Sequence, residues 1–582
     1  MPRPPLALLA ALLAPAAAGA QTVVGQVVDG ADGAPLASAV VSLLDTGRVR
    51  VAGVLTDSAG RFTLRAPGAG SWTVRADRVG SASAASEPLV LGVGDSVSIR
   101  LALGAAARLS AVRVTARERC RVRPAEGESA ARLWDEARKA LVGTAVGESQ
   151  GRHATRLGTF VREMEPDRKT IRREVWTMRP STIQAFRSMD VADLGARGFV
   201  EPALSASGAD SVVYYAPDAE VLLSDAFLES HCLRAVRPPP TRPGQLGLAV
   251  EPVPRRGEKR ADVRGTLWID TASFELRDFE FEYVDLPPSV PPGRAGGIVG
   301  FARTPDGAWF VDRWMISMPA QEVVSHVRAA TPTLHNLHAR DVREDEIVAR
   351  LTEVGGRAIV EGVPPRRDGP TVLSGMLRDS SSAATPGPLE RARISVLGTP
   401  YAAEVNEAGE FYLEVPRAGD YVVRVDAPRA ASLGLGWTQL LSMQPGRELR
   451  VEAAVPSAST LRRLHCTAGT AESPLVAGVV RAWQAERRGD VPQLRAAAGV
   501  SVEVEWREAA WPADWKERRT VRTDARGSFR VCDLPAGALV TLRARRPGAE
   551  SEPWSGPAPA GAVVVQDLLL VSARTVGART SP

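Results

Sequence analysis

The sequence predicts a mainly β protein with three antiparallel β-sandwiches and a central α+β domain, which has a curved antiparallel sheet and one amphipathic helix. The first observation is a turn pattern that occurs three times: an Asp or Asn, a glycine three residues later and a phenylalanine two residues after that. The second is that segments alternating apolar and polar residues flank these turns, as half-buried strands do. The third is length, because 582 residues are too many for one hydrophobic core.

Each of the three turns is expected to reverse the chain and so to form a β-hairpin. An Asx side chain accepts a hydrogen bond from its own backbone two residues on, glycine takes a positive φ, and the aromatic residue begins the returning strand. Each copy has a second glycine ten residues after the first. The structural turn residues are Asp57, Gly60, Phe62, Asn406, Gly409, Phe411, Asp524, Gly527 and Phe529. We interpret their Asx side chains as hairpin caps and not as ligands or catalysts.

Composition divides the chain into five segments. Residues 1–20 have an early arginine, an apolar run and a small-residue end, which predict a signal peptide cleaved before Gln21. The sandwiches are predicted at 21–104, 371–456 and 464–575, and the central domain at 105–362. The last sandwich contains an insertion from Trp483 to Ala498, rich in Arg and Ala, that is expected to be partly helical.

Residues 21–104 carry about seven short strands with turn signals between them, which favours an antiparallel sandwich. Three stretches, Gly25–Asp29, Thr56–Phe62 and Gly70–Val74, closely resemble the carboxypeptidase regulatory-like domain, a transthyretin-like β-sandwich. In many bacterial envelope proteins such a domain stands at the mature N-terminus. The resemblance implies the same sandwich for the two later copies of the turn.

The central domain begins with a helix. Apolar residues at 130, 133, 134, 137, 140 and 141 predict one amphipathic helix of about four turns. Strand patterns follow from Arg152 to about Val360 and predict a curved antiparallel sheet. The strand Gly265–Asp270 with Phe274–Leu276 resembles the periplasmic lipoprotein-carrier fold, in which a curved sheet cups lipid chains. Ordinary core packing of the aromatic residues is the alternative.

Four cysteines, Cys120, Cys232, Cys466 and Cys532, lie in the part predicted to be exported, where disulfides persist. Four cysteines allow three pairings. Cys466 opens the last sandwich and Cys532 follows Phe529 by three residues, so we pair these two, which leaves Cys120 with Cys232. A zinc site is the alternative, but the sequence has no CxxC or close Cys/His cluster.

We predict no catalytic, cofactor-binding or metal-binding residue, and therefore no enzyme. A carboxypeptidase zinc site would need a His with Glu three residues on, and none of the six histidines has one. His335 and His338 could share one helical face, but no third ligand is evident. The Gly147–Gly151 segment has the spacing of a nucleophile elbow, yet it follows a predicted helix and not a strand, so we expect a helix-ending loop.

The net charge of +5 and the pI of about 9.2 do not predict a nucleic-acid partner. Acidic residues are interspersed with the basic ones throughout. After residue 20, no segment approaches the roughly 20 apolar residues of a membrane-spanning helix. We therefore expect no transmembrane segment in the mature chain.

These observations favour a non-catalytic exported envelope protein that acts in binding or assembly, in the periplasm, at the outer-membrane periphery or outside the cell. Its partner would be an envelope protein, a glycan or a lipid. Two other functions stay open. A carbohydrate-binding protein would use exposed tryptophans among Trp72, Trp483, Trp511 and Trp515 to stack on sugars. A lipid or lipoprotein carrier would use the central curved sheet.

Overall fold

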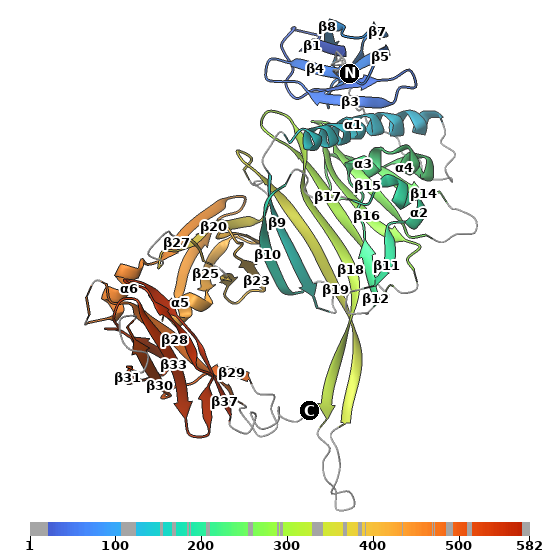
Figure 1. Cartoon of the computed structure of the whole chain (residues 1–582). Coiled ribbons are helices and arrows are strands. Elements are labelled where there is room, and N and C mark those ends of the chain that lie inside the picture. Colours follow the sequence, from blue (N-terminus) through green and yellow to red (C-terminus); the bar gives the residue numbers. More distant parts are fainter. Residues whose placement is uncertain are drawn as a thin grey trace, which may run out of the picture. The chain divides into compact units, whose positions relative to one another are not determined.

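The computed structural model is mainly β and divides into two compact units (Figure 1). The first unit is Met1–Leu157 with Ser181–Val363, and the second is Gly158–Pro180 with Pro364–Pro582. The residues described are 21–105, 124–151, 155–165, 170–182, 186, 188–204, 210–253, 260–287, 290, 295–328, 342–364, 369–381, 387–389, 391–433, 435–467, 469–470, 472–484, 493–508 and 515–572. The predicted signal peptide lies outside them. Among these residues, no helix is both long and apolar enough to span a membrane.

The first unit begins with a β-sandwich. In one sheet, β1 (Gln21–Asp29) lies between β4 (Arg61–Ala66), which is antiparallel to it, and β8 (Ser96–Leu103), which is parallel. The other sheet contains β3 (Arg50–Leu55), β2 (Val40–Leu44), β5 (Gly70–Asp77), β6 (Ala84–Ala85) and β7 (Leu89–Leu91). Alternate apolar side chains of both sheets meet as one core, because successive residues of a strand face opposite sides.

A seven-stranded antiparallel meander forms the larger part of the first unit. Its strands are β13 (His231–Val236), β14 (Gln245–Pro252), β15 (Asp262–Asp270), β16 (Leu276–Val284), β17 (Gly296–Arg303), β18 (Trp309–Arg328) and β19 (Val342–Val360). The antiparallel sheet predicted for this region is confirmed. A separate ribbon pairs β11 (Val200–Leu204) with β12 (Asp210–Tyr214).

The predicted amphipathic helix is α1 (Pro124–Ser149), which is longer than expected and lies between the sandwich and the meander (Figure 1). Its buried residues Leu133, Ala137, Ala140 and Leu141 join the core of the meander. The Gly147–Gly151 segment ends this helix, as predicted, because α1 stops at Ser149.

Three short helices in the first unit were not predicted: α2 (Val191–Arg197), α3 (Ala219–Leu223) and α4 (Asp225–Ser230). Asp190, Asp218 and Ser224 cap them by accepting hydrogen bonds from backbone N–H groups of the first turns. These caps are the signal that sequence reasoning overlooked.

The second unit contains a sandwich that includes a hairpin from earlier in the chain. One sheet has the order β9 (Thr155–Met164), β10 (Ile171–Thr182), β23 (Tyr401–Glu404), β22 (Arg393–Val396), β25 (Gly419–Asp426) and β26 (Trp437–Met443), in which β10 runs parallel to β23. In the other, β20 (Thr371–Asp379) pairs antiparallel with β21 (Gly387–Pro388) and β24 (Glu410–Val415) and parallel with β27 (Glu448–Val455).

The last part of the second unit is the third sandwich, whose ten strands are connected through β28 and enclose one hydrophobic core. Two short helices precede it, α5 (Pro428–Ser432) and α6 (Ala458–His465). The strands are β28 (Leu475–Gln484), β29 (Gln493–Ala496), β30 (Ser501–Arg507), β31 (Glu517–Arg522), β32 (Ser528–Val531), β33 (Ala538–Arg546), β34 (Ala549–Ser551), β35 (Trp554–Ala558), β36 (Val563–Val565) and β37 (Leu568–Ser572). Here β28 pairs antiparallel with β32 and parallel with β36 and β37.

The insertion from Trp483 to Ala498 was predicted to be partly helical, but both of its described ends are strands. Residues 481–484 of β28 pair antiparallel with β29. Ala482 is buried whereas Trp483 is exposed, which is the alternation of a strand. The middle of the insertion lies outside the described residues.

Candidate functional site

The three predicted turns have the same hydrogen bonds. Asp57 Oδ1 accepts from the N–H groups of Ala59 at 2.9 Å and Arg61 at 2.8 Å. Asn406 Oδ1 accepts from Ala408 at 3.0 Å and Glu410 at 2.8 Å. Asp524 Oδ1 accepts from Arg526 at 2.8 Å and Ser528 at 2.9 Å. An amide oxygen can take the place of a carboxylate here because the turn needs a hydrogen-bond acceptor at this position.

The turn glycines bind the hairpin to the first strand of each sandwich. Gly60, Gly409 and Gly527 have φ values of +71°, +84° and +72°. Their carbonyl groups accept hydrogen bonds from Val27, Leu377 and Val480 at 2.8, 2.7 and 2.8 Å. A left-handed φ and this close approach both favour glycine.

A different glycine, in the first strand of each sandwich, faces the phenylalanine of the turn. Sequence reasoning missed this facing glycine. Register pairs place Gly25 opposite Phe62, Gly375 opposite Phe411 and Gly478 opposite Phe529. A Cβ at any of these glycines would collide with a backbone carbonyl group, that of Ile99, Val451 or Gln566, and would also crowd the phenylalanine ring. An isolated glycine inside a strand was the available signal.

A buried cluster of charges joins the first sandwich to α1. Lys139, which is 2% exposed, donates to Ser81 O at 2.8 Å and pairs with Glu136 at 2.7 Å and Asp135 at 2.8 Å. Glu136 Oε2 also accepts from Gly80 N–H at 2.9 Å, so this helix carboxylate reaches the sandwich directly.

A second buried carboxylate extends this cluster. Asp77, at the end of β5 and 1% exposed, pairs with Arg75 at 3.0 Å and Arg138 at 3.1 Å. Burial by itself would lower the pKa of Arg138, but the carboxylates of Asp77 and Asp135 raise it above its ordinary value. Burial would likewise raise the pKa of Asp135, but Lys139 and Arg138 hold it below its ordinary value. These opposite shifts indicate mutual stabilisation of the charges.

The first sandwich has the turn and strand order described above, and its sequence matches a known family. Residues 22–104 match the carboxypeptidase regulatory-like domain. The resemblance stated from the sequence is confirmed for this stretch. The regulatory-like domain is therefore the part of the chain that packs on α1 through Asp77, Gly80 and Ser81.

Comparisons with solved structures give distant similarities. The TIE protein of Bacillus anthracis is 10% identical over 63% of this chain and 64% of its own, with a TM-score of 0.16. A minor pilin of Streptococcus agalactiae is 11% identical over 36% of this chain and 97% of its own, with a TM-score of 0.13.

A cohesin–dockerin complex of Acetivibrio cellulolyticus is 18% identical over 14% of this chain, with a TM-score of 0.11. The matched segment spans about half of that chain, 52%. These TM-scores lie well below the value expected of a shared overall fold. The search of curated proteins finds no match.

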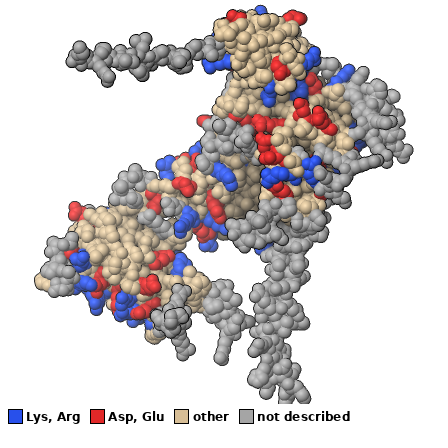
Figure 2. Space-filling model, turned by 45° about the vertical axis from the view of Figure 1, so that its right-hand side comes forward, with Lys and Arg blue, Asp and Glu red and all other residues tan. Residues whose placement is uncertain are grey.

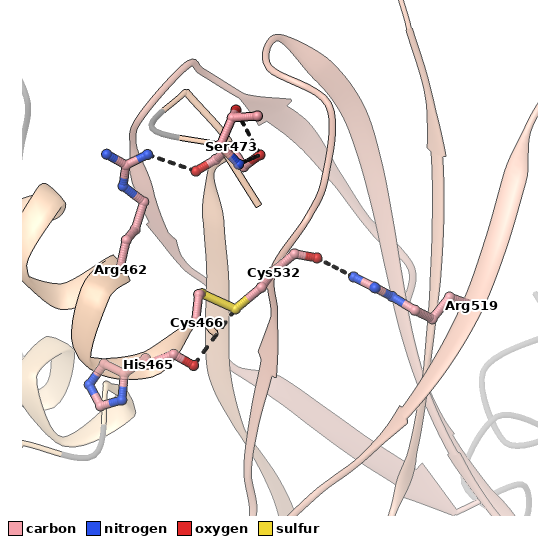
Figure 3. Close-up of a disulfide and its surroundings, with 7 residues drawn as sticks. Arg462, His465, Cys466, Ser473, Arg519 and Cys532 are labelled. Atoms are coloured by element: carbon pink, nitrogen blue, oxygen red, sulfur yellow. Dashed lines mark hydrogen bonds between the residues drawn. A yellow bond between two sulfur atoms is a disulfide. The ribbon is translucent and has the colours of Figure 1, made fainter. Parts of the chain in front are cut away.

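The structure joins Cys466 to Cys532, the pair that the sequence predicts (Figure 3). Arg462 donates to Ser473 O at 2.9 Å beside the bond, and Arg519 donates to Cys532 O. The bridge attaches the end of α6 to the strand that follows the third turn. For the other predicted pair, Cys232 is disulfide-bonded, and Cys120 lies outside the described residues.

The other candidate residues are dispersed. Trp72 of the regulatory-like domain packs against its core and donates to Gly68 O at 3.2 Å, whereas Trp483 and Trp515 are 59% and 63% exposed. Trp511, His335 and His338 lie outside the described residues. Within the described part of the chain, no three His, Cys, Asp or Glu side chains gather in a way that could hold a metal ion.

A buried carboxylate lies where β10 joins the sandwich of the second unit. Glu174 accepts from Arg162 Nε and Trp176 Nε1, both at 2.6 Å. The Trp176 ring contacts Tyr412, with 5.3 Å between centroids. Burial raises the pKa of Glu174 above its ordinary value, although Arg162 and Trp176 favour the ionised form. Ionised Glu174 therefore costs this sandwich folding free energy.

This shift predicts a pH dependence of the second unit. Between the ordinary pKa of 4.5 and the raised one, the folded state holds a proton that the unfolded state releases, so stability falls as the pH rises. We expect Glu174→Gln to remove this fall, whose slope is at most about 1.4 kcal/mol per pH unit. Urea unfolding between pH 4 and pH 8 measures it, with the exposed Glu404→Gln as control. An unchanged slope in Glu174→Gln would contradict the assignment.

Proposed function

We propose that this chain is a non-catalytic exported protein of the bacterial envelope, built from three carboxypeptidase regulatory-like sandwiches at 21–104, 371–456 and 464–575 around an α+β domain at 105–362. It acts in binding or assembly. The observation that carries this proposal is the recurrence of one structural set, Asx cap, left-handed glycine, phenylalanine and facing glycine, in each sandwich.

Several features support a binding role. The Asx side chains of the turns are occupied by backbone N–H groups, so these residues serve the fold. The buried charges at α1 are paired with one another, which supports an interface role and not a reacting group. The aromatic residues Phe279 and Phe281 of the meander lie in its core, which favours core packing over a lipid site.

Two features support export. The Cys466–Cys532 bridge belongs to the kind that persists in oxidising compartments. Residues 1–20 have the composition of a signal peptide. We place the mature chain in the periplasm, at the outer-membrane periphery or outside the cell, with an envelope protein, a glycan or a lipid as partner.

The proposal is tested by fractionating cells that express the full chain and sequencing the N-terminus of the recovered protein. We expect it in an envelope or extracellular fraction, beginning at Gln21. The purified protein is then assayed against a panel of ester, peptide and glycoside substrates. A hydrolase activity that a single Ser or His substitution abolishes would refute the non-catalytic role, and recovery in the cytoplasm with residues 1–20 intact would refute export.

A further inference from the structure

One face of the last sandwich presents a tryptophan at one end and arginines at the other. Seven strands lie side by side in the order β29-β28-β37-β34-β33-β30-β31. On β29 and β28, Leu494 lies opposite Trp483. On the next strands, Val571, Glu550, Arg545, Ser501 and Arg522 lie opposite one another in turn. Trp483 and Val571 each follow the last paired residue of β28 and β37, so they continue the same row. We call this row of seven residues the outer row.

The tryptophan end of the outer row is apolar and accessible. Trp483 is 59% exposed, and its cross-strand neighbour Leu494 is 43% exposed. Leu569, on the same side of β37, is also exposed. Large apolar side chains gathered on a surface commonly mark a binding site. The flat face of an indole carries partial negative charge and attracts the polarised C–H groups on the face of a sugar ring.

The arginine end has cationic groups without partners. Arg545 pairs with Glu503 at 2.8 Å and with Glu550 at 3.4 Å. Among the described residues, no carboxylate lies within 4.0 Å of the guanidinium groups of Arg522, Arg543 and Arg546. Arg543, Arg545, Arg546, Glu550 and Val571 line a cavity of about 680 Å³. The cavity therefore reaches from Val571 on β37, the strand that pairs with β28, to Arg543 and Arg546.

The spacing suits an extended ligand. Trp483 and Arg545 lie three strands apart, about 14 Å at the usual separation of strands. Arginine binds carboxylates through two parallel N–H donors. Arg545 already binds carboxylates on this face. Arg543 and Arg546, which also line the cavity, present their guanidinium groups to a ligand.

We propose that the outer row and the cavity beside it bind an acidic polysaccharide that carries carboxylate groups, with a sugar ring stacked on Trp483 and its carboxylates on Arg543 and Arg546. This inference rests on the proposed binding function and names its ligand. The carboxylates of Glu503 and Glu550 on the same face can accept hydrogen bonds from sugar hydroxyl groups. Figure 2 shows acidic and basic side chains interspersed over the side of the protein that it draws.

The test measures binding of the full chain to alginate oligosaccharides by calorimetry, with dextran as a neutral polysaccharide and oligo-dT as a nucleic acid. We expect Trp483→Ala, and separately the double variant Arg543→Ala/Arg546→Ala, to weaken the Kd for alginate about tenfold. The double variant should also reduce the dependence of the Kd on salt.

Matched controls are available in the same sandwich. Trp515→Ala removes a tryptophan of similar exposure outside the outer row, and Arg526→Ala removes an exposed arginine of the third turn. Both controls should keep the alginate Kd within about twofold of the unsubstituted chain. Circular dichroism checks that each variant is folded.

The proposal is overturned by any of four results: no alginate binding, equal weakening by Trp515→Ala, unchanged binding in both test variants, or tighter binding of oligo-dT or dextran than of alginate. These outcomes concern the ligand alone. The envelope role would still be judged by the fractionation and the hydrolase assays, so the two failures can be told apart.

Discussion

Lys139→Ala is expected to destabilise the first unit by about 3–5 kcal/mol. The side chain is buried, and its removal leaves Glu136 buried without its cationic partner. It also removes the donor to Ser81 O, which is one of the contacts between the regulatory-like domain and α1. Urea unfolding, with hydrogen exchange of the α1 amides as the local readout, measures the loss.

Two variants serve as controls for Lys139. Arg234→Ala removes one partner of an exposed ion pair with Glu251 and should cost less than about 1 kcal/mol. The double variant Lys139→Met/Glu136→Gln leaves no uncompensated charge and should recover most of the loss. A Lys139→Ala effect no larger than that of Arg234→Ala would show that the cluster does not stabilise the junction.

Gly375→Ala is expected to destabilise the second unit by about 3 kcal/mol or more. A Cβ at Gly375 would overlap the carbonyl group of Val451 on β27 and would lie 3.1 Å from the Phe411 ring. The methyl group can be accommodated only if β20 moves away from β27, and overpacking of this kind typically costs 1–3 kcal/mol even without a backbone collision. Thermal and urea unfolding measure the change.

Gly387→Ala is the matched control, because nothing lies within 4 Å of a Cβ at that position of the same sandwich. It should change stability by less than about 0.5 kcal/mol. If Gly375→Ala were as stable as Gly387→Ala, the sandwich would not require the facing glycine. The shared glycine would then no longer support three related copies of the sandwich.

The turns could be predicted from the sequence because their chemistry is local. Asp57 and Gly60 lie within four residues of the N–H groups that fix the turn. The residues of the sequence pattern are therefore the residues that make the contacts. The facing glycine could be predicted only in part, because its partner lies on another strand. Gly25 lies in a strand whose alternation is visible, but its requirement comes from Phe62 across the sheet. A glycine inside a strand indicates such an approach without naming the partner.

The charge cluster and the β10 junction could not be predicted, since their partners are distant in the sequence. Lys139 and Ser81 are 58 residues apart, and nothing local distinguishes this lysine from a solvated one. Trp176 alternates like any strand residue, and its contact with Tyr412 depends on the parallel pairing of β10 with β23. Patterns of hydrophobicity predict that a face is buried, but they do not say by what.

In each sandwich the first strand runs parallel to the last: β1 to β8, β20 to β27, and β28 to β37. Parallel neighbours place the entry and the exit of the chain at opposite ends of the sandwich. Tension applied through the two ends would therefore slide these strands past each other along their length. In the regulatory-like domain, every hydrogen bond from Thr22 opposite Ser96 to Asp29 opposite Leu103 would carry the load together and would not open one at a time. We therefore expect this domain to resist mechanical force applied through its two ends.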